Sequence, residues 1–149
     1  FSTQEMFIVA TVDATLAAQQ AYIAAAALGL GGVFIGGVRN DIRAVCEILN
    51  LPHLVYPVFG MCLGYPDDSP NQKPRLPIDV IYKIDKYDEE NDETLIANYD
   101  KQIMEYYINR TKGEIKESWS ERCKRLVTEK ERGNVGAILK EKGFNIAEH

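Results

Sequence analysis

The sequence has few residues of the kinds that build metal sites and disulfide frameworks. It contains three cysteines, Cys46, Cys62 and Cys123, and two histidines, His53 and His149. No two cysteines form a CxxC pair, so the usual spacing of a structural zinc site is missing. An odd and scattered set of cysteines is typical of reduced thiols in a cytoplasmic protein, and we predict that location. Neither histidine belongs to a Ser/His/Asp arrangement, so we predict no catalytic side chain.

Charge is scarce in the first 66 of the 149 residues. That part holds six charged residues, and the other 33 of the 39 follow it. With 22 acidic and 17 basic residues, the formal net charge is −5, which argues against a nucleic-acid-binding surface. The length fits one ordinary domain. The first part therefore has the composition of a buried segment, and the rest has that of a segment facing water.

An uncharged stretch of 25 residues, 14–38, is long enough to cross a membrane. Its second half contains five glycines, which a single helix would not tolerate well. We therefore expect no membrane association, and we predict a buried helix over 13–28 followed by a buried strand over 32–37. Thr11 or Asp13 can cap the helix, and Gly29 can end it in the left-handed conformation.

Further elements follow from periodicity and from turn residues. A helix is expected from a cap at Asn40 to Leu49. The apolar run 55–63 predicts a core strand, which Pro57 confines to an edge or to a later start. The ranges expected after it are a loop over 67–77, a half-buried strand over 78–84, and helices over 92–109, about 118–131 and 135–142.

Aromatic residues of the second half are interpreted first as packing residues. Trp119 is expected to anchor a helix, and Tyr99, Tyr106 and Tyr107 are expected to pack from one helix, with a subunit interface as a further role. His53, between two loop-forming neighbours, is interpreted as an ordinary loop residue.

Two short motifs could bind a ligand. The pair Gly36–Gly37 follows a predicted strand, where glycines let the main chain approach a flat ligand; a simple tight turn is the alternative. It lacks the GxGxxG spacing of a dinucleotide fingerprint. Lys73 and Arg75, held by the proline between them, could clamp a phosphate monoester; an exposed basic loop is the alternative. Together the two motifs suit a mononucleotide site.

These motifs also carry a family resemblance that covers nearly the whole chain. The run ALGLGGVFIGGVRN (27–40) resembles a signature of the nitroreductase superfamily, and FGMCLGYP (59–66) followed by KPRLP (73–77) resembles a second one. The segments NYD (98–100), YYINR (106–110) and SWS (118–120) resemble the tail of one branch, the oxygen-insensitive NADPH nitroreductases and NAD(P)H:flavin oxidoreductases.

The resemblance implies FMN-dependent two-electron chemistry, in which NAD(P)H is the co-substrate and a nitroaromatic compound, a quinone or free flavin is reduced. It places Lys73 and Arg75 on the FMN phosphate. Four residues would lie along the isoalloxazine ring: Phe34, Ile35, Gly36 and Gly37. Arg110 matches an arginine associated with the NADPH phosphate, whereas Ile115 stands where a second one is expected. Arg132 is a further candidate for the nicotinamide nucleotide, with a solvated surface charge as its alternative.

The resemblance also implies an α+β fold, a three-layer sandwich with a small, mainly antiparallel sheet, and a homodimer with flavin at the interface. Residues 1–84 would supply the central helix, the flavin-facing turn and the core strands. Residues 85–149 would supply outer helices and a tail that embraces the partner. No segment matches the family's His/Ser/Arg-rich phosphate motif, so we expect the C-terminal portion of such a protein. A non-catalytic flavin-binding or dimerisation module is the alternative.

Overall fold

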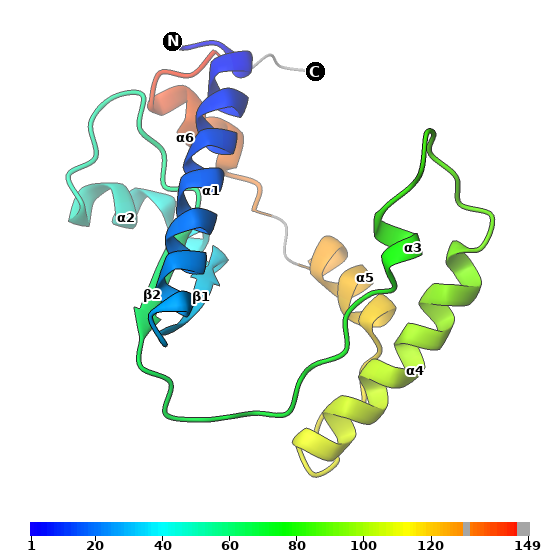
Figure 1. Cartoon of the computed structure of the whole chain (residues 1–149). Helices are drawn as coiled ribbons and strands as arrows, with labels where there is room; N and C mark the ends of the chain where they lie inside the picture. The colour runs from blue at the N-terminus through cyan, green and yellow to red at the C-terminus, as the bar shows by residue number, and fades with distance from the viewer. Residues whose placement is uncertain (130–131, 146–149) are drawn as a thin grey trace. The chain divides into compact units, whose positions relative to one another are not determined.

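The computed structural model describes residues 1–129 and 132–145, and the chain divides into two compact units. The first unit combines residues 1–69 with 132–149 and contains α1 (Gln4–Ala27), β1 (Gly31–Ile35), the 3-10 helix η1 (Gly36–Asn40), α2 (Ile42–Ile48), β2 (Gly60–Gly64) and α6 (Val135–Glu141) (Figure 1). The second unit, residues 70–131, contains α3 (Ile78–Ile81), α4 (Asp92–Arg110) and α5 (Trp119–Glu129). The proposed division of roles at residue 84 stays a prediction.

The long helix α1 begins earlier than the sequence pattern predicted. It starts at Gln4 because Thr3 has an extended backbone and its hydroxyl accepts the Met6 N–H at 3.2 Å. The predicted caps, Thr11 and Asp13, are therefore wrong, since both lie inside the helix. The Thr11 hydroxyl instead donates to a main-chain carbonyl one turn earlier, at 2.7 Å, which keeps this polar group satisfied within the helix.

The end of α1 agrees with the prediction. The helix stops at Ala27, and Gly29 has a left-handed φ of 80°. The glycines that follow belong to β1 and η1, so the uncharged stretch is a helix followed by a strand, as predicted. Among the described residues, α1 is the one helix long and apolar enough to cross a membrane, and a core helix of a soluble protein meets the same criterion.

The predicted burial of α1 and β1 is wrong for this chain. Of the 24 residues of α1, all of them described, only Ala25 is buried. Val33 and Phe34 on β1 remain 53% and 39% exposed. The reason is geometric, because among the described residues α1 packs mainly against the two short strands, and Phe7 near its start contacts Tyr56 and Phe144, which leaves most of its apolar surface uncovered.

The sheet formed by the described residues has two antiparallel strands, β1 and β2, paired from Gly31 opposite Gly64 to Ile35 opposite Gly60. The predicted strand over 32–37 thus ends two residues early, where η1 begins. The predicted strand over 55–63 takes its later start, at Gly60, beyond Pro57 and its missing N–H.

Gly32 lets α1 approach this sheet closely. A Cβ at this position would lie 2.7 Å from a Leu63 methyl and 2.8 Å from the Tyr22 ring. We expect Gly32→Ala to lower the free energy of unfolding by about 1–3 kcal/mol through overpacking, measured by urea titration. Gly64→Ala is the matched control, since a Cβ there meets nothing within 4 Å. Equal stability of the two variants would contradict this packing.

The helices α2 and α6 form the buried part of the first unit. Asp41, and not the predicted Asn40, caps α2 by accepting the Ala44 N–H at 3.1 Å. The predicted helix over 135–142 is confirmed as α6. An exposed ion pair of 2.5 Å joins Arg43 to Glu141. Four apolar side chains are buried here: Ile42 of α2, Ile138 and Leu139 of α6, and Phe144, which follows α6.

In the second unit, one predicted element is wrong. Residues 78–84 do not form a strand; Ile78–Ile81 is the short helix α3. Alternating apolar residues make a strand only where a neighbouring strand supplies hydrogen bonds. Here the Val80 N–H donates to the Pro77 carbonyl and the Tyr82 N–H to the Ile78 carbonyl, so the segment satisfies its main chain locally.

The predicted helices over 92–109 and 118–131 are confirmed as α4 and α5, although residues 130 and 131 lie outside the described part. Ser118 and Glu121 form a reciprocal capping box at the start of α5, with bonds of 2.8 and 3.2 Å. Trp119 meets the buried Tyr99 edge to face at 6.0 Å, as expected of a helix anchor.

Candidate functional site

The glycine pair after β1 opens a 3-10 helix. Phe34 and Ile35 end the strand, and Gly36 and Gly37 begin η1. An added Cβ at Gly36 would meet only the Arg39 guanidinium within 4 Å, the nearest atom at 3.4 Å. The surface above Gly36 is therefore open, which is the property a flat ligand requires of this position.

A pocket of about 380 Å³ lies beside this glycine. It brings together two of the predicted flavin contacts, Phe34 and Gly36, but its lining does not include Ile35 or Gly37. The other lining residues, which the sequence did not reveal, are Thr15, Gln19, Arg39 and Phe59. The sequence nevertheless marks two of these residues as unusual. Arg39 is one of only six charged residues in the first 66, and Gln19 interrupts an alanine-rich run.

Packed aromatic rings and one cation form part of the wall of this pocket. Phe34 meets Phe59 edge to face at 5.3 Å and stacks on Tyr22 at 5.7 Å, so its ring is held in place from two sides. The Arg39 guanidinium donates to the Val58 carbonyl, which keeps its charge at the pocket wall. An apolar lining with one positive group suits a flat heterocycle that carries polar atoms at its edge.

The predicted cations Lys73 and Arg75 belong to the second unit. Lys73 is half-buried, and its ammonium donates to the Tyr107 hydroxyl at 2.9 Å while lying 5.1 Å from the ring centre. The hydrogen bond from Lys73 is the largest cause that lowers the pKa of Tyr107, and nearby Arg122 adds to it. Arg75 is exposed.

Tyrosines of α4 hold the basic loop in place. The Tyr99 hydroxyl donates to the Pro74 carbonyl at 3.2 Å, and the Tyr106 hydroxyl donates to the Asn71 carbonyl at 3.3 Å. The interpretation of these tyrosines as packing residues is thus confirmed for the buried Tyr99 and incomplete for the others. The loop is tied to α4 by hydroxyl groups and is more than an unattached surface segment.

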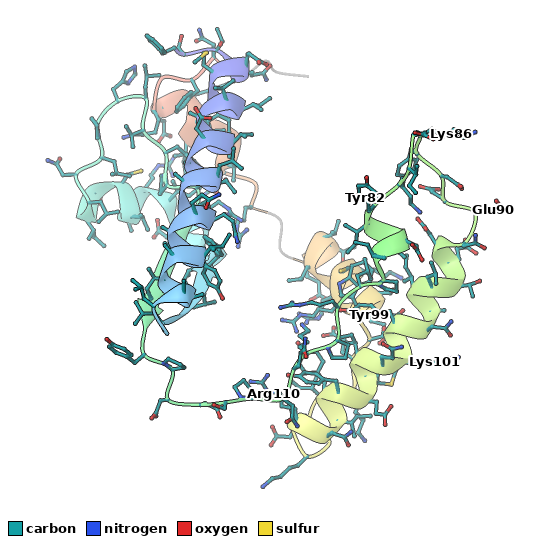
Figure 2. The ribbon with its side chains drawn as sticks, viewed as in Figure 1. Tyr82, Lys86, Glu90, Tyr99, Lys101 and Arg110 are labelled. Atoms are coloured by element: carbon teal, nitrogen blue, oxygen red, sulfur yellow. The ribbon has the colours of Figure 1, made fainter. Side chains whose placement is uncertain are left out.

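The two arginines predicted to contact a nicotinamide nucleotide lie in different units. Arg110, which is labelled in Figure 2, ends α4 and donates to the Tyr106 hydroxyl at 2.7 Å. Arg132 donates to the Asn40 side-chain oxygen at 3.3 and 3.1 Å, within the first unit. Each guanidinium is oriented by a neighbour, and their joint role in one site stays a prediction.

Residues suited to other chemistry are not gathered in the described structure. Residues 1–129 and 132–145 contain no group of three or more His, Cys, Asp and Glu that could hold a metal ion. The three cysteines, all in the described part, are free. His53 packs its imidazole against Gly143, which has a left-handed φ of 92° after α6, so it serves as a packing residue of its loop.

The chain belongs to the nitroreductase family. Residues 1–65 match the family model described as "Nitroreductase family", and residues 73–147 match "Nitroreductase family, C-terminal domain". This confirms the predicted family and the predicted branch.

The relatives include an oxygen-insensitive NADPH nitroreductase of Salmonella typhimurium, 41% identical over 140 residues, covering 94% of this chain and 58% of the relative. An FMN reductase (NADPH) of Bacillus subtilis is 41% identical over 143 residues, covering 95% and 57%. The chain therefore spans less than three fifths of the length of these curated relatives.

Solved structures agree with the predicted α+β fold. A nitroreductase from B. subtilis matches with a TM-score of 0.90 at 40% identity, covering 97% of this chain and 59% of that one. An NADPH:FMN oxidoreductase from Vibrio harveyi, complexed with NAD+, matches with a TM-score of 0.84 at 36% identity, covering 96% and 58%. The predicted α+β class with a small antiparallel sheet is thereby confirmed.

Proposed function

We propose that the protein is an FMN-dependent oxidoreductase of the nitroreductase type, with NAD(P)H as co-substrate. The observation that carries this proposal is the pocket of about 380 Å³ that Phe34, Gly36 and Phe59 line, because its open glycine and aromatic wall fit an isoalloxazine ring. The printed names of the two relatives, an NADPH nitroreductase and an FMN reductase, support the same chemistry.

The chain's own residues position the cofactor in this proposal. Phe34, Ile35, Gly36 and Gly37 lie along the ring, and the main-chain N–H groups of η1 lie at its edge. Gly36 leaves the ring room to approach, and the two aromatic contacts of Phe34 fix the pocket wall before the ligand arrives. When bound, FMN would supply two-electron transfer from NAD(P)H to a nitroaromatic compound, a quinone or free flavin.

Lys73 and Arg75 hold the FMN phosphate in this proposal. Lys73 provides a compact charge whose direction is set by Tyr107, and Arg75 provides an exposed guanidinium two residues further along the chain. Both groups are donors that suit the oxygens of a phosphate monoester. The donor chemistry therefore fits the cofactor that the relatives' names indicate.

Arg110 and Arg132 contact the nicotinamide nucleotide in this proposal. Both guanidinium groups already have hydroxyl or amide partners that orient them. Ile115, which is 39% exposed, stands where the resemblance expects a second phosphate-binding arginine, and it supplies no charge there. The relatives' names favour NADPH over NADH as the co-substrate. The ratio of kcat/KM for NADPH to that for NADH measures whether this preference holds with isoleucine at position 115.

A homodimer with α1 at its interface is part of the proposal, together with a cytoplasmic location, no membrane or nucleic-acid partner, and a small-molecule electron acceptor. The support is the apolar surface of α1, which the described strands leave uncovered. Spaced along one side of this helix are exposed apolar residues: Ile8, Val9, Val12, Leu16 and Ile23. Such a stripe is typical of a helix that packs against a second chain.

Disrupting the stripe tests the dimer. We expect Leu16→Glu to shift the full-length protein that carries this sequence from dimer to monomer in sedimentation analysis, because a carboxylate cannot be buried there without a partner. Ala17→Glu is the control, since the neighbouring exposed residue points about 100° away around the helix. A wild-type protein that sediments as a monomer would contradict the proposal.

The proposed activity is tested with purified full-length protein, NADPH and a nitroaromatic compound. We expect the protein to carry bound flavin and to oxidise NADPH only when the acceptor is present. A colourless protein that also fails to take up added FMN would exclude the proposed function.

A further inference from the structure

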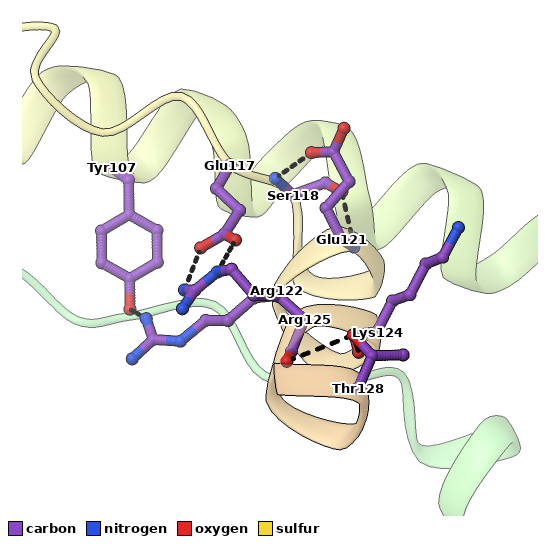
Figure 3. A network of polar contacts seen from close by, with 8 residues as sticks. All are labelled: Tyr107, Glu117, Ser118, Glu121, Arg122, Lys124, Arg125 and Thr128. Atoms are coloured by element: carbon purple, nitrogen blue, oxygen red, sulfur yellow. Dashed lines mark hydrogen bonds and ion pairs between the residues drawn. The ribbon is translucent and has the colours of Figure 1, made fainter. Parts of the chain in front are cut away.

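Two cations from separate segments of the second unit form hydrogen bonds to the hydroxyl of Tyr107. It accepts a hydrogen bond from the Lys73 ammonium at 2.9 Å and another from the Arg122 guanidinium at 3.3 Å. The two charges also lie 5.1 and 6.0 Å from the centre of the Tyr107 ring. Figure 3 shows Arg122 of α5 reaching the hydroxyl of Tyr107 on α4. Two cationic donor groups thus meet at one oxygen atom.

An acidic group drawn with this cluster, Glu117, is already engaged. Glu117 binds Arg125 through both carboxylate oxygens, at 2.7 and 2.9 Å, and Figure 3 shows this pair beside Arg122. Two cations that share one hydroxyl repel each other, and an anion between them would remove that repulsion. The pKa of Tyr107 is lowered by the same two cations, which is consistent with a strongly positive local potential.

We propose that Tyr107 positions Lys73 and Arg122 as a pair of phosphate-binding cations, and that Arg122 is a third basic contact of the FMN phosphate beside Lys73 and Arg75. This inference rests on the proposed function, which assigns the phosphate to Lys73. The Tyr107 oxygen accepts one hydrogen bond from each cation, so its own O–H group can still donate to a phosphate oxygen. Further N–H groups of Lys73 and Arg122 supply charge-assisted bonds to the same dianion.

Binding of FMN and of riboflavin, which lacks the phosphate, separates this role from a structural one. Both are titrated into the apo form of the full-length protein that carries this sequence, followed by flavin fluorescence. We expect Tyr107→Phe and Arg122→Gln each to raise the Kd for FMN by about 3- to 10-fold and to leave the Kd for riboflavin within about twofold. Arg122→Lys should restore most of the lost affinity, since it keeps the charge.

A basic residue of the same helix provides a matched control. Lys124→Gln removes an exposed positive charge from α5 at a position that has no role in the proposed site. It should not change the preference for FMN over riboflavin. Thermal midpoints of all variants show whether the fold is intact, and the exposed Arg122 tests the inference if Tyr107→Phe is unstable.

Each possible result has a defined meaning. Selective loss of FMN affinity in both variants supports the inference. A wild-type preference for FMN that both variants retain would overturn it while leaving the proposed function intact. A rise in the KM for NADPH without a change in FMN affinity would overturn it by assigning Arg122 to the nicotinamide nucleotide. A wild-type protein that does not distinguish FMN from riboflavin would overturn the phosphate assignment of Lys73 itself.

Discussion

Replacing Lys73 by glutamine is expected to raise the Kd for FMN by about 10- to 100-fold, the range for losing a charged hydrogen bond to a phosphate. Lys73 is half-buried and already oriented by the Tyr107 hydroxyl at 2.9 Å, so little freedom is lost when it binds an anion. Glutamine retains similar length and a donor but removes the charge. Fluorescence titration of the apo full-length protein with FMN measures the effect.

Riboflavin provides the internal control for this variant. Because it lacks the phosphate, its Kd should be the same for wild type and Lys73→Gln within about twofold. Lys101→Gln, an exposed lysine on α4, controls for the loss of one positive charge from the same unit. Equal weakening of FMN and riboflavin would show that Lys73 supports the fold or the ring and not the phosphate.

Gly36→Val is expected to weaken both FMN and riboflavin, again by about 10- to 100-fold, because the added methyl groups occupy the space that the ring requires. The protein itself can accept a Cβ at this position, since only the Arg39 guanidinium lies within 4 Å. The thermal midpoint should therefore change little while flavin binding falls. Titration with the two flavins and a melting curve measure both quantities.

The control for this variant is Gly64→Val on β2, where an added Cβ meets nothing within 4 Å. It should bind both flavins as the wild type does. Lys73→Gln and Gly36→Val thus give opposite patterns toward riboflavin, which distinguishes the phosphate end of the ligand from its ring. Normal flavin affinity in Gly36→Val would exclude the pocket beside η1 as the ring site.

Local signals account for the parts of the fold that the sequence predicted well. Helices α4 and α5 have clear periodicity and a capping box at Ser118, so neighbours in sequence determine them. The strand predicted over 78–84 failed because strand formation depends on a partner that periodicity does not reveal. The start of α1 was missed because Thr3 caps it ahead of the alanine-rich run.

The candidate site was predictable where one short motif carries it. Gly36 was found from the glycine pair after the predicted strand, and Phe34 from the family resemblance, and both line a pocket. Contacts between distant segments were not accessible, since Tyr107 follows Lys73 by 34 positions and Arg132 follows Asn40 by 92. Only the packing of the loop against α4, and the contact of Arg132 with Asn40 at the end of η1, creates these pairs.

The flavin content of the purified full-length protein, read by absorbance before and after anaerobic addition of NADPH, tests the central claim most directly. We expect a bound flavin spectrum, with phosphate-bearing FMN as the released cofactor, and bleaching of that spectrum by NADPH. A protein that holds no flavin after incubation with FMN, or whose bound flavin NADPH leaves unchanged, would contradict the account.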